Sequence, residues 1–147
     1  MPRIALWNLF FGFLLVCIAA AAGPIIANDL TNNFAAQLQD GLPHSRDWLT
    51  TLQASAHGHL NLFGVLHVIT GLTMPHARQT HKVRMFVTAG LGAGALAMGP
   101  LLLWRSHVTP AREIDPSGVA IGVLLVFALT ALVTHTACLW QAFARRD

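Results

Sequence analysis

The sequence predicts an all-α membrane protein with four transmembrane helices in a bundle and both termini cytoplasmic. Apolar residues make up 54% of the 147 residues and charged residues only 10%, whereas about one quarter of the residues in a soluble domain are charged. Four segments are long and apolar enough to cross a hydrocarbon core, which takes about 20 helical residues: 4–27, 57–74, 85–104 and 118–143. We therefore expect a single transmembrane domain, residues 1–147, in contact with a lipid bilayer.

The first apolar segment ends in small residues, CIAAAAG, of the kind found at signal-peptide cleavage sites. Its apolar run is longer than the core of a secretory signal, so we expect a retained span. Residues 28–54 are expected to form an outer loop. Within this loop, the helical spacing of Leu30, Phe34, Leu38 and Leu42 predicts a short amphipathic helix along the outer face.

The third apolar segment carries small residues four apart, Gly90 and Gly94, beside a row of alanines. Such residues let a second helix, or less commonly a flat cofactor, approach the backbone closely. Pro100 follows and predicts a kink, because it cannot donate a backbone hydrogen bond. We expect this segment to pack tightly against another helix.

The basic residues give the orientation, since short loops rich in Lys and Arg stay in the cytoplasm. One set of flanks holds six: Arg3, Arg78, Lys82, Arg84, Arg145 and Arg146. The other holds three: Arg46, Arg105 and Arg112. Both termini should therefore be cytoplasmic, in a multi-pass protein of a bacterial-type inner (plasma) membrane. This asymmetry also accounts for the net charge of +3, and no basic and aromatic pattern indicates a nucleic-acid partner.

Eight histidines are present, of which four fall in predicted loops and are expected to be solvated: His44, His76, His81 and His107. The other four lie in predicted spans: His57, His59, His67 and His135. A buried imidazole needs partners, so each is either a cofactor ligand or a hydrogen-bonding bridge between helices. For His57 both interpretations stay open, and for the other three we expect the bridge.

Helical geometry separates His57 from His59. At 100° per residue, His57, Gly64 and Gly71 share one stripe with Asn61, whereas His59 points roughly 200° away from His57. A ligand, a small polar group and two glycines on one stripe would suit a porphyrin face laid against the helix. The stripe therefore leaves two interpretations of His57 open: a heme ligand with room for the ring at Gly64 and Gly71, or a hydrogen bond across helices.

The predicted spans contain few other residues that could take part in a reaction. All six acidic residues lie outside the predicted spans and the chain has no Tyr, which argues against a carboxylate proton relay. Cys17 and Cys138 are expected to be small apolar fillers. Any reaction in the membrane must therefore rest on a cofactor together with His and Asn.

The second span, AHGHLNLFG, resembles the His-rich helix of small four-helix relatives of the heme-copper oxidase catalytic subunit. It also resembles styrene oxide isomerase, a four-helix membrane enzyme, at five positions matched without a gap: Ala56, His57, Leu62, Gly64 and Pro75. The resemblance implies a homotrimer that binds heme b through His57. The family's active-site Asn aligns with Phe63, so Asn61 is the residue expected to take its catalytic role, and the family's third-helix Tyr has no counterpart.

Three functions follow from these observations. The first is an epoxide isomerase in which ferric heme acts as a Lewis acid on a small apolar epoxide and yields an aldehyde without redox turnover. The alternative is a cytochrome-like electron-transfer or accessory subunit, in which a second histidine, with His135 as the main candidate, fills the sixth position. The third is a structural membrane subunit without cofactor. The depth of His135 in its span predicts that it lies too far from His57 to share an iron.

Overall fold

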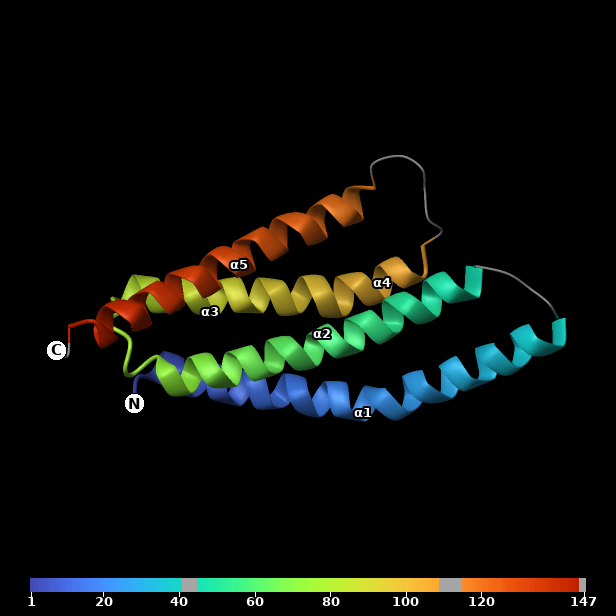
Figure 1. Cartoon of the computed structure of the whole chain (residues 1–147), viewed down its shortest axis with the longest axis horizontal. Coiled ribbons are helices and arrows are strands. Elements are labelled where there is room, and N and C mark those ends of the chain that lie inside the picture. The colour runs from blue at the N-terminus through green and yellow to red at the C-terminus, as the bar shows by residue number, and fades with distance from the viewer. Residues whose placement is uncertain (41–44, 109–114, 146–147) are drawn as a thin grey trace.

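The computed structural model describes residues 1–40, 45–108 and 115–145, and every regular element within these ranges is a helix (Figure 1). The elements are α1 (Arg3–Asp40), α2 (Ser45–Thr73), α3 (His81–Leu96), the π-helix η1 (Ala97–Leu101), α4 (Leu102–Ser106) and α5 (Pro116–Phe143). Each predicted span lies inside this helical set, with α3, η1 and α4 forming the third. The prediction of an all-α protein is confirmed.

The prediction that residues 28–54 form a loop is wrong, because most of this segment is helical. α1 continues without a break to Asp40, and α2 already begins at Ser45. The change from apolar to polar residues near Asn28 does not end the helix, because polar residues can leave lipid without breaking a helix. Even Pro24 lies inside α1 without ending it, and Gly41 and Pro43, which follow Asp40, lie outside the described residues. The predicted separate amphipathic helix is therefore the continuation of α1 as far as Asp40.

α1 and α2 pack against each other as an antiparallel pair along much of their length. A Cβ placed on Gly12 of α1 would lie 2.6 Å from the Gly64 carbonyl oxygen, and one placed on Gly71 of α2 would lie 2.8 Å from the Ala5 carbonyl oxygen. Small residues seven apart on each helix thus bring the two backbones into contact, as at close helix interfaces in membranes.

The small residues of α3 make room for two different neighbours. A Cβ on Gly90 would collide with Ala131 of α5, and one on Gly94 with the ring of Phe63 on α2. The predicted role in tight helix packing is confirmed. Pro100 lies inside η1, and the wider turn of a π-helix accommodates a residue that lacks a backbone N–H.

α5 begins at a capped end and packs along α3. The Asp115 side chain accepts a hydrogen bond from the Ser117 N–H, and Pro116 occupies the first helical turn, which are both favourable at a helix start. Buried apolar side chains of α1, α2, α3 and α5 form the main core: Leu15, Phe63, Val87, Leu91, Ala95 and Ala128. α1 and α5 therefore flank α2 and α3, each of which still exposes some large apolar side chains, such as Leu72 and Met85.

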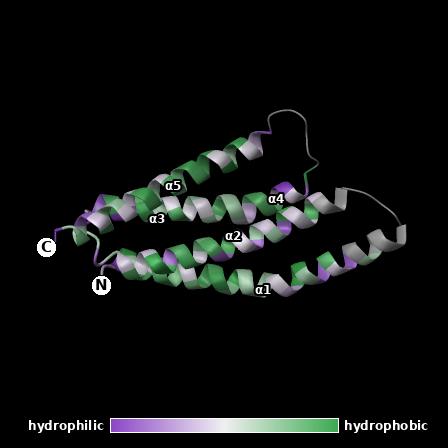
Figure 2. Cartoon of the chain, in the orientation of Figure 1, coloured by the Kyte–Doolittle hydropathy of each residue, from purple (hydrophilic) through white to green (hydrophobic). Residues whose placement is uncertain are grey.

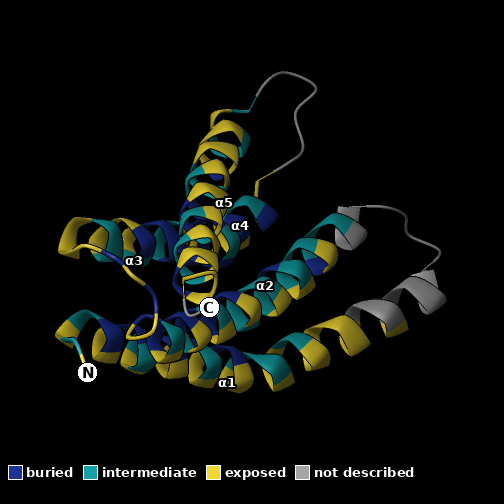
Figure 3. Ribbon diagram, turned by 60° about the vertical axis from the view of Figure 1, so that its left-hand side comes forward, coloured by how far each residue is buried: buried dark blue, intermediate teal, exposed yellow. Residues whose placement is uncertain are grey.

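The outer surface of the bundle is apolar. Within the described residues, three helical segments are long and apolar enough to cross a membrane: Arg3–Asn32, His81–Ser106 and Pro116–Phe143. α2 is not among them, and Figure 2 shows it with more polar residues than α5. Figure 3 shows exposed residues along the outer sides of α1 and α5, and Trp140 is 67% exposed. These features are those of a membrane protein, whose outward-facing apolar side chains contact lipid.

Candidate functional site: the histidines of the bundle

His57 lies near the middle of α2 and faces α1. The Cε1 atom of its ring would be 3.3 Å from a Cβ built on Gly23, so the absence of a side chain there gives the imidazole its room. His57 is half-buried, and its Nδ1 is buried without a hydrogen-bond partner. No bond to its Nε2 is present among the described residues either. The ring is thus held by packing, and both nitrogens are free of protein hydrogen bonds.

The glycines that share a stripe with His57 make room for α1 and not for a porphyrin. A Cβ on Gly64 would stand 2.8 Å from Val16 Cγ2, and one on Gly71 would stand 2.8 Å from the Ala5 carbonyl oxygen. The expectation that these two glycines leave space for a ring is therefore corrected, because helix α1 fills that space. Asn61 is half-buried one turn from His57, and no side-chain contact of its amide is recorded. Ligation of heme by His57 itself stays a prediction.

His59 bonds within its own helix. Its Nδ1 lies 2.8 Å from the Ser55 carbonyl oxygen and 3.3 Å from the Ser55 hydroxyl. Since the carbonyl can only accept, the ring donates to it and uses Nδ1 for that bond. His59 therefore does not share an environment with His57, as their positions on the helix predicted.

His67 forms a buried bridge between α1 and α2. It is 1% exposed, and its Nδ1 lies 2.8 Å from Oδ1 of Asn8. The amide oxygen only accepts, so the imidazole donates, while the Asn8 amide nitrogen donates to the Thr88 hydroxyl at 2.7 Å and to the Ile4 carbonyl at 2.9 Å. Phe11 packs edge-on against the ring. One polar chain thus joins three helices, and the second ring nitrogen, Nε2, is buried without a partner.

His135 of α5 has both ring nitrogens bonded. Gln79 Nε2 lies 2.8 Å from Nδ1, and Thr73 Oγ1 lies 2.8 Å from Nε2. The Gln79 amide donates to Nδ1, so Nε2 carries the proton and donates to Thr73, whose hydroxyl donates to the Ile69 carbonyl. His135 joins the end of α2 to α5. Thr73 is 16 residues from His57, roughly 24 Å along α2, so the predicted separation of His57 and His135 is confirmed.

Three of the predicted loop histidines are exposed: His76, His81 and His107. This confirms their predicted solvation, and His44 lies outside the described residues. The two cysteines are unpaired. Within the described residues no group of three or more His, Cys, Asp or Glu side chains could hold a metal ion, so a metal centre built from protein ligands alone has no support there.

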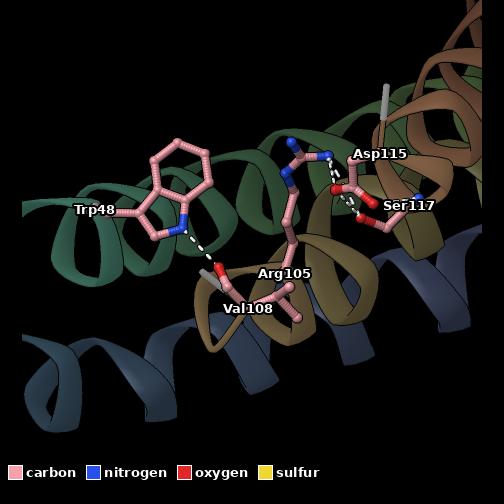
Figure 4. Close-up of polar contacts among 5 residues, drawn as sticks. All are labelled: Trp48, Arg105, Val108, Asp115 and Ser117. Carbon is pink, nitrogen blue, oxygen red and sulfur yellow. Dashed lines mark hydrogen bonds and ion pairs between the residues drawn. The ribbon is translucent and has the colours of Figure 1, made fainter. Parts of the chain in front are cut away.

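At the opposite end of the bundle from the termini, a polar cluster joins α2, α4 and α5 (Figure 4). The Arg105 guanidinium forms an ion pair with Asp115 at 2.8 Å and lies 5.8 Å from the centre of the Trp48 ring. Trp48 donates to the Val108 carbonyl at 3.2 Å. Hydrogen bonds from the Ser117 hydroxyl and backbone N–H, together with the charge of Arg105, lower the pKa of the Asp115 carboxyl from its ordinary value of 3.8. These contacts tie the ends of α2, α4 and α5 together.

The partners of the buried histidines were not identified from the sequence. Asn8, Thr88 and Gln79 come from three distant segments, and their contacts with the two imidazoles depend on how the helices pack. One signal was present, since Asn8 is a polar residue in an apolar span and such residues commonly mark an interhelical bond. Gly23, which gives His57 its room, carries no comparable signal in the sequence.

In comparisons with known proteins, no family model, curated protein or solved structure matches this chain.

Proposed function

We propose that this protein is an integral membrane heme b protein in which His57 would hold the heme iron, and that it isomerises small apolar epoxides to aldehydes. One observation carries the proposal. Of the four histidines in the predicted spans, His57 alone makes no hydrogen bond within the described part of the chain. An imidazole in lipid without a protein partner is a candidate ligand.

The roles of the site residues follow from their chemistry. His57 provides a neutral ring nitrogen, the usual protein ligand of heme iron. Bound heme supplies an iron that polarises the epoxide oxygen as a Lewis acid. Asn61, one turn along α2, offers an amide that can donate a hydrogen bond to a substrate oxygen. Gly64 and Gly71 are not part of this proposal, because α1 covers them.

The hydrogen bonds of the other histidines favour an isomerase over an electron carrier. A carrier works best with both axial positions filled, which needs a second imidazole. His135 has both nitrogens engaged, and His67 uses one nitrogen on Asn8 with its ring enclosed by the bundle. An open sixth position is what Lewis-acid chemistry requires.

The membrane arrangement belongs to the same proposal. α2 is the fourth span, shielded from lipid by α1 and α3, and both termini are cytoplasmic in a bacterial-type inner membrane. The chain forms a homo-oligomer, a trimer by its resemblance to styrene oxide isomerase. Large apolar side chains on the outer side of α5 leave ample surface for such contacts: Val119, Val123, Val126, Leu129 and Val133.

The test is the absorption spectrum of the purified chain produced in heme-sufficient cells. We expect a Soret band that His57→Ala abolishes and that His59→Ala, the matched control one half-turn away, retains. Ferric protein should be high-spin, should respond to added imidazole or aryl epoxide, and should convert styrene oxide to the aldehyde without reductant. A low-spin spectrum indifferent to both additions would assign the protein to the cytochromes.

A structural subunit without cofactor is the second candidate, because His67 and His135 each bridge helices. If wild-type protein is colourless and stays colourless when hemin is added, this second function replaces the first.

A further inference from the structure

An open apolar groove runs between α1 and α3 on the side of the bundle away from α5. Its deeper part is a pocket of about 330 Å³ that α2 floors through Leu60. The residues that line this pocket are all apolar or Gly: Phe11, Leu15, Ile18, Leu60, Gly92, Ala95, Leu96, Gly99, Pro100 and Leu103. Helices α1 and α3 touch each other little along this side, so the groove is open toward the bilayer.

A second pocket of about 470 Å³ continues the groove toward the end of the bundle that holds both termini. It lies between Arg3, Ile4 and Trp7 of α1 and Met85, Thr88 and Ala89 of α3. One helical turn separates Trp7 from Phe11, and Ala89 is three residues from Gly92, so the two pockets lie end to end. From Arg3 to Ile18 the groove extends roughly 22 Å along α1, more than half of a hydrocarbon core of about 30 Å.

At the end of the groove that lies near both termini, the charged side chains that the structure describes are all positive. The start of α1, the connection from α2 to α3 and the end of α5 meet there (Figure 1). In the part of the chain that the structure describes, this end carries five cations and no acidic residue: Arg3, Arg78, Lys82, Arg84 and Arg145. Arg3 lines the groove itself, and the buried Nε of Arg84 has no hydrogen-bond partner among the described residues.

We infer that this groove binds one anionic phospholipid, with an acyl chain along the apolar part and the phosphate beside Arg3. Basic residues at the ends of transmembrane helices bind anionic headgroups, and Trp7, which lines the groove four residues from Arg3, has the kind of amphipathic ring that is enriched at membrane interfaces. The groove is long enough for a chain of one leaflet, and its cation occupies the end where that lipid's phosphate would be. This inference does not depend on the heme proposal.

Gly92 gives a sharp test, because a Cβ there meets nothing within 4 Å while the residue lines the groove. Gly92→Leu should fill the groove without disturbing the fold. Gly122→Leu is the matched control, since its Cβ also meets nothing and it lies on α5 outside the groove. Full-length protein in nanodiscs of phosphatidylglycerol and phosphatidylcholine is transferred to detergent, and retained lipid is counted by native mass spectrometry.

We expect wild-type protein and Gly122→Leu to retain one phosphatidylglycerol per chain, and Gly92→Leu to lose it. Arg3→Gln should weaken the preference for phosphatidylglycerol roughly fivefold, the effect of one basic residue at an anionic surface. Arg78→Gln, at the same end but outside the groove, should leave the preference unchanged. Equal retention by both glycine variants, equal losses in both arginine variants, or an altered oligomeric state of Gly92→Leu with its lipid retained, would overturn the inference.

Discussion

The four histidines in the predicted spans differ in how many of their ring nitrogens bond to protein. His135 uses both nitrogens and His59 uses Nδ1 on its own helix, whereas His57 uses neither. A ring with two protein partners is fixed in one tautomer and one orientation. Since His57 has no protein partner among the described residues, no hydrogen bond from them fixes its tautomer.

The hydrogen bond between Asn8 and His67 predicts how much the free energy of unfolding falls when one buried partner is removed. Asn8→Ala removes the acceptor for His67 Nδ1–H and the donor to Thr88, so the free energy of unfolding should fall by about 0.6–2 kcal/mol. Asn28→Ala is the control, because Asn28 is exposed on the same helix. Reversible unfolding in mixed micelles measures both. A double variant with His67→Leu should lose less than the sum of the single losses, and strict additivity would contradict a coupled pair.

The lowered pKa of Asp115 predicts that the folded state loses stability at low pH. Since the folded pKa is below 3.8, the carboxylate stabilises the fold at pH values above the unfolded pKa, and this contribution is lost as pH falls through the lowered folded value. Thermal unfolding at pH 7 and near pH 3 should show a drop in Tm for wild-type protein. The drop should be smaller in Asp115→Asn, which cannot ionise. The same drop in both would assign the acid sensitivity to other groups.

The sequence predicted a helix in each of the four apolar segments, but not where α1 ends and α2 begins. Hydrophobicity marks where a helix leaves lipid and not where the helix itself ends, so residues 28–54 were expected as a loop although 28–40 and 45–54 are helical. The sequence did not predict the interface between these two helices either. The spacing of Gly64 and Gly71 showed that something approaches closely, but whether a helix or a cofactor does so depends on the partner segment.

At the level of elements, the α1–α2 interface predicts opposite effects for two glycine substitutions. Gly12→Ala places a Cβ 2.6 Å from the Gly64 carbonyl oxygen and 2.8 Å from the Val68 backbone nitrogen, so the helices must separate and stability should fall by about 1–3 kcal/mol. Gly58→Ala meets nothing within 4 Å and should stabilise α2 by about 0.5–1 kcal/mol. Unfolding in mixed micelles compares them. Equal shifts of the same sign would mean that α1 does not contact α2 at Gly12.

In the molecule as a whole, two central helices, α2 and α3, are flanked by α1 and α5. α2 carries more polar side chains in its predicted span than any other helix and packs against α1, α3 and α4, while α1 and α5 present large apolar side chains outward. Of its polar side chains, His67 and Thr73 bond to neighbouring helices, which is how polar groups are satisfied inside a membrane bundle.

The topology of the molecule gives the last prediction. α1 begins and α5 ends at the same end of the bundle (Figure 1), which is the arrangement expected for an even number of crossings. That end carries Arg3, Arg78, Lys82, Arg84 and Arg145, while Arg105 at the other end is paired with Asp115. Unpaired cations near the ends of spans stay in the cytoplasm, so a reporter fused after Asp147 should be cytoplasmic and one inserted near Asp40 external. An external reporter after Asp147 would reverse the orientation, and reporters on opposite sides of the membrane at Met1 and Asp147 would remove α2 from the spans.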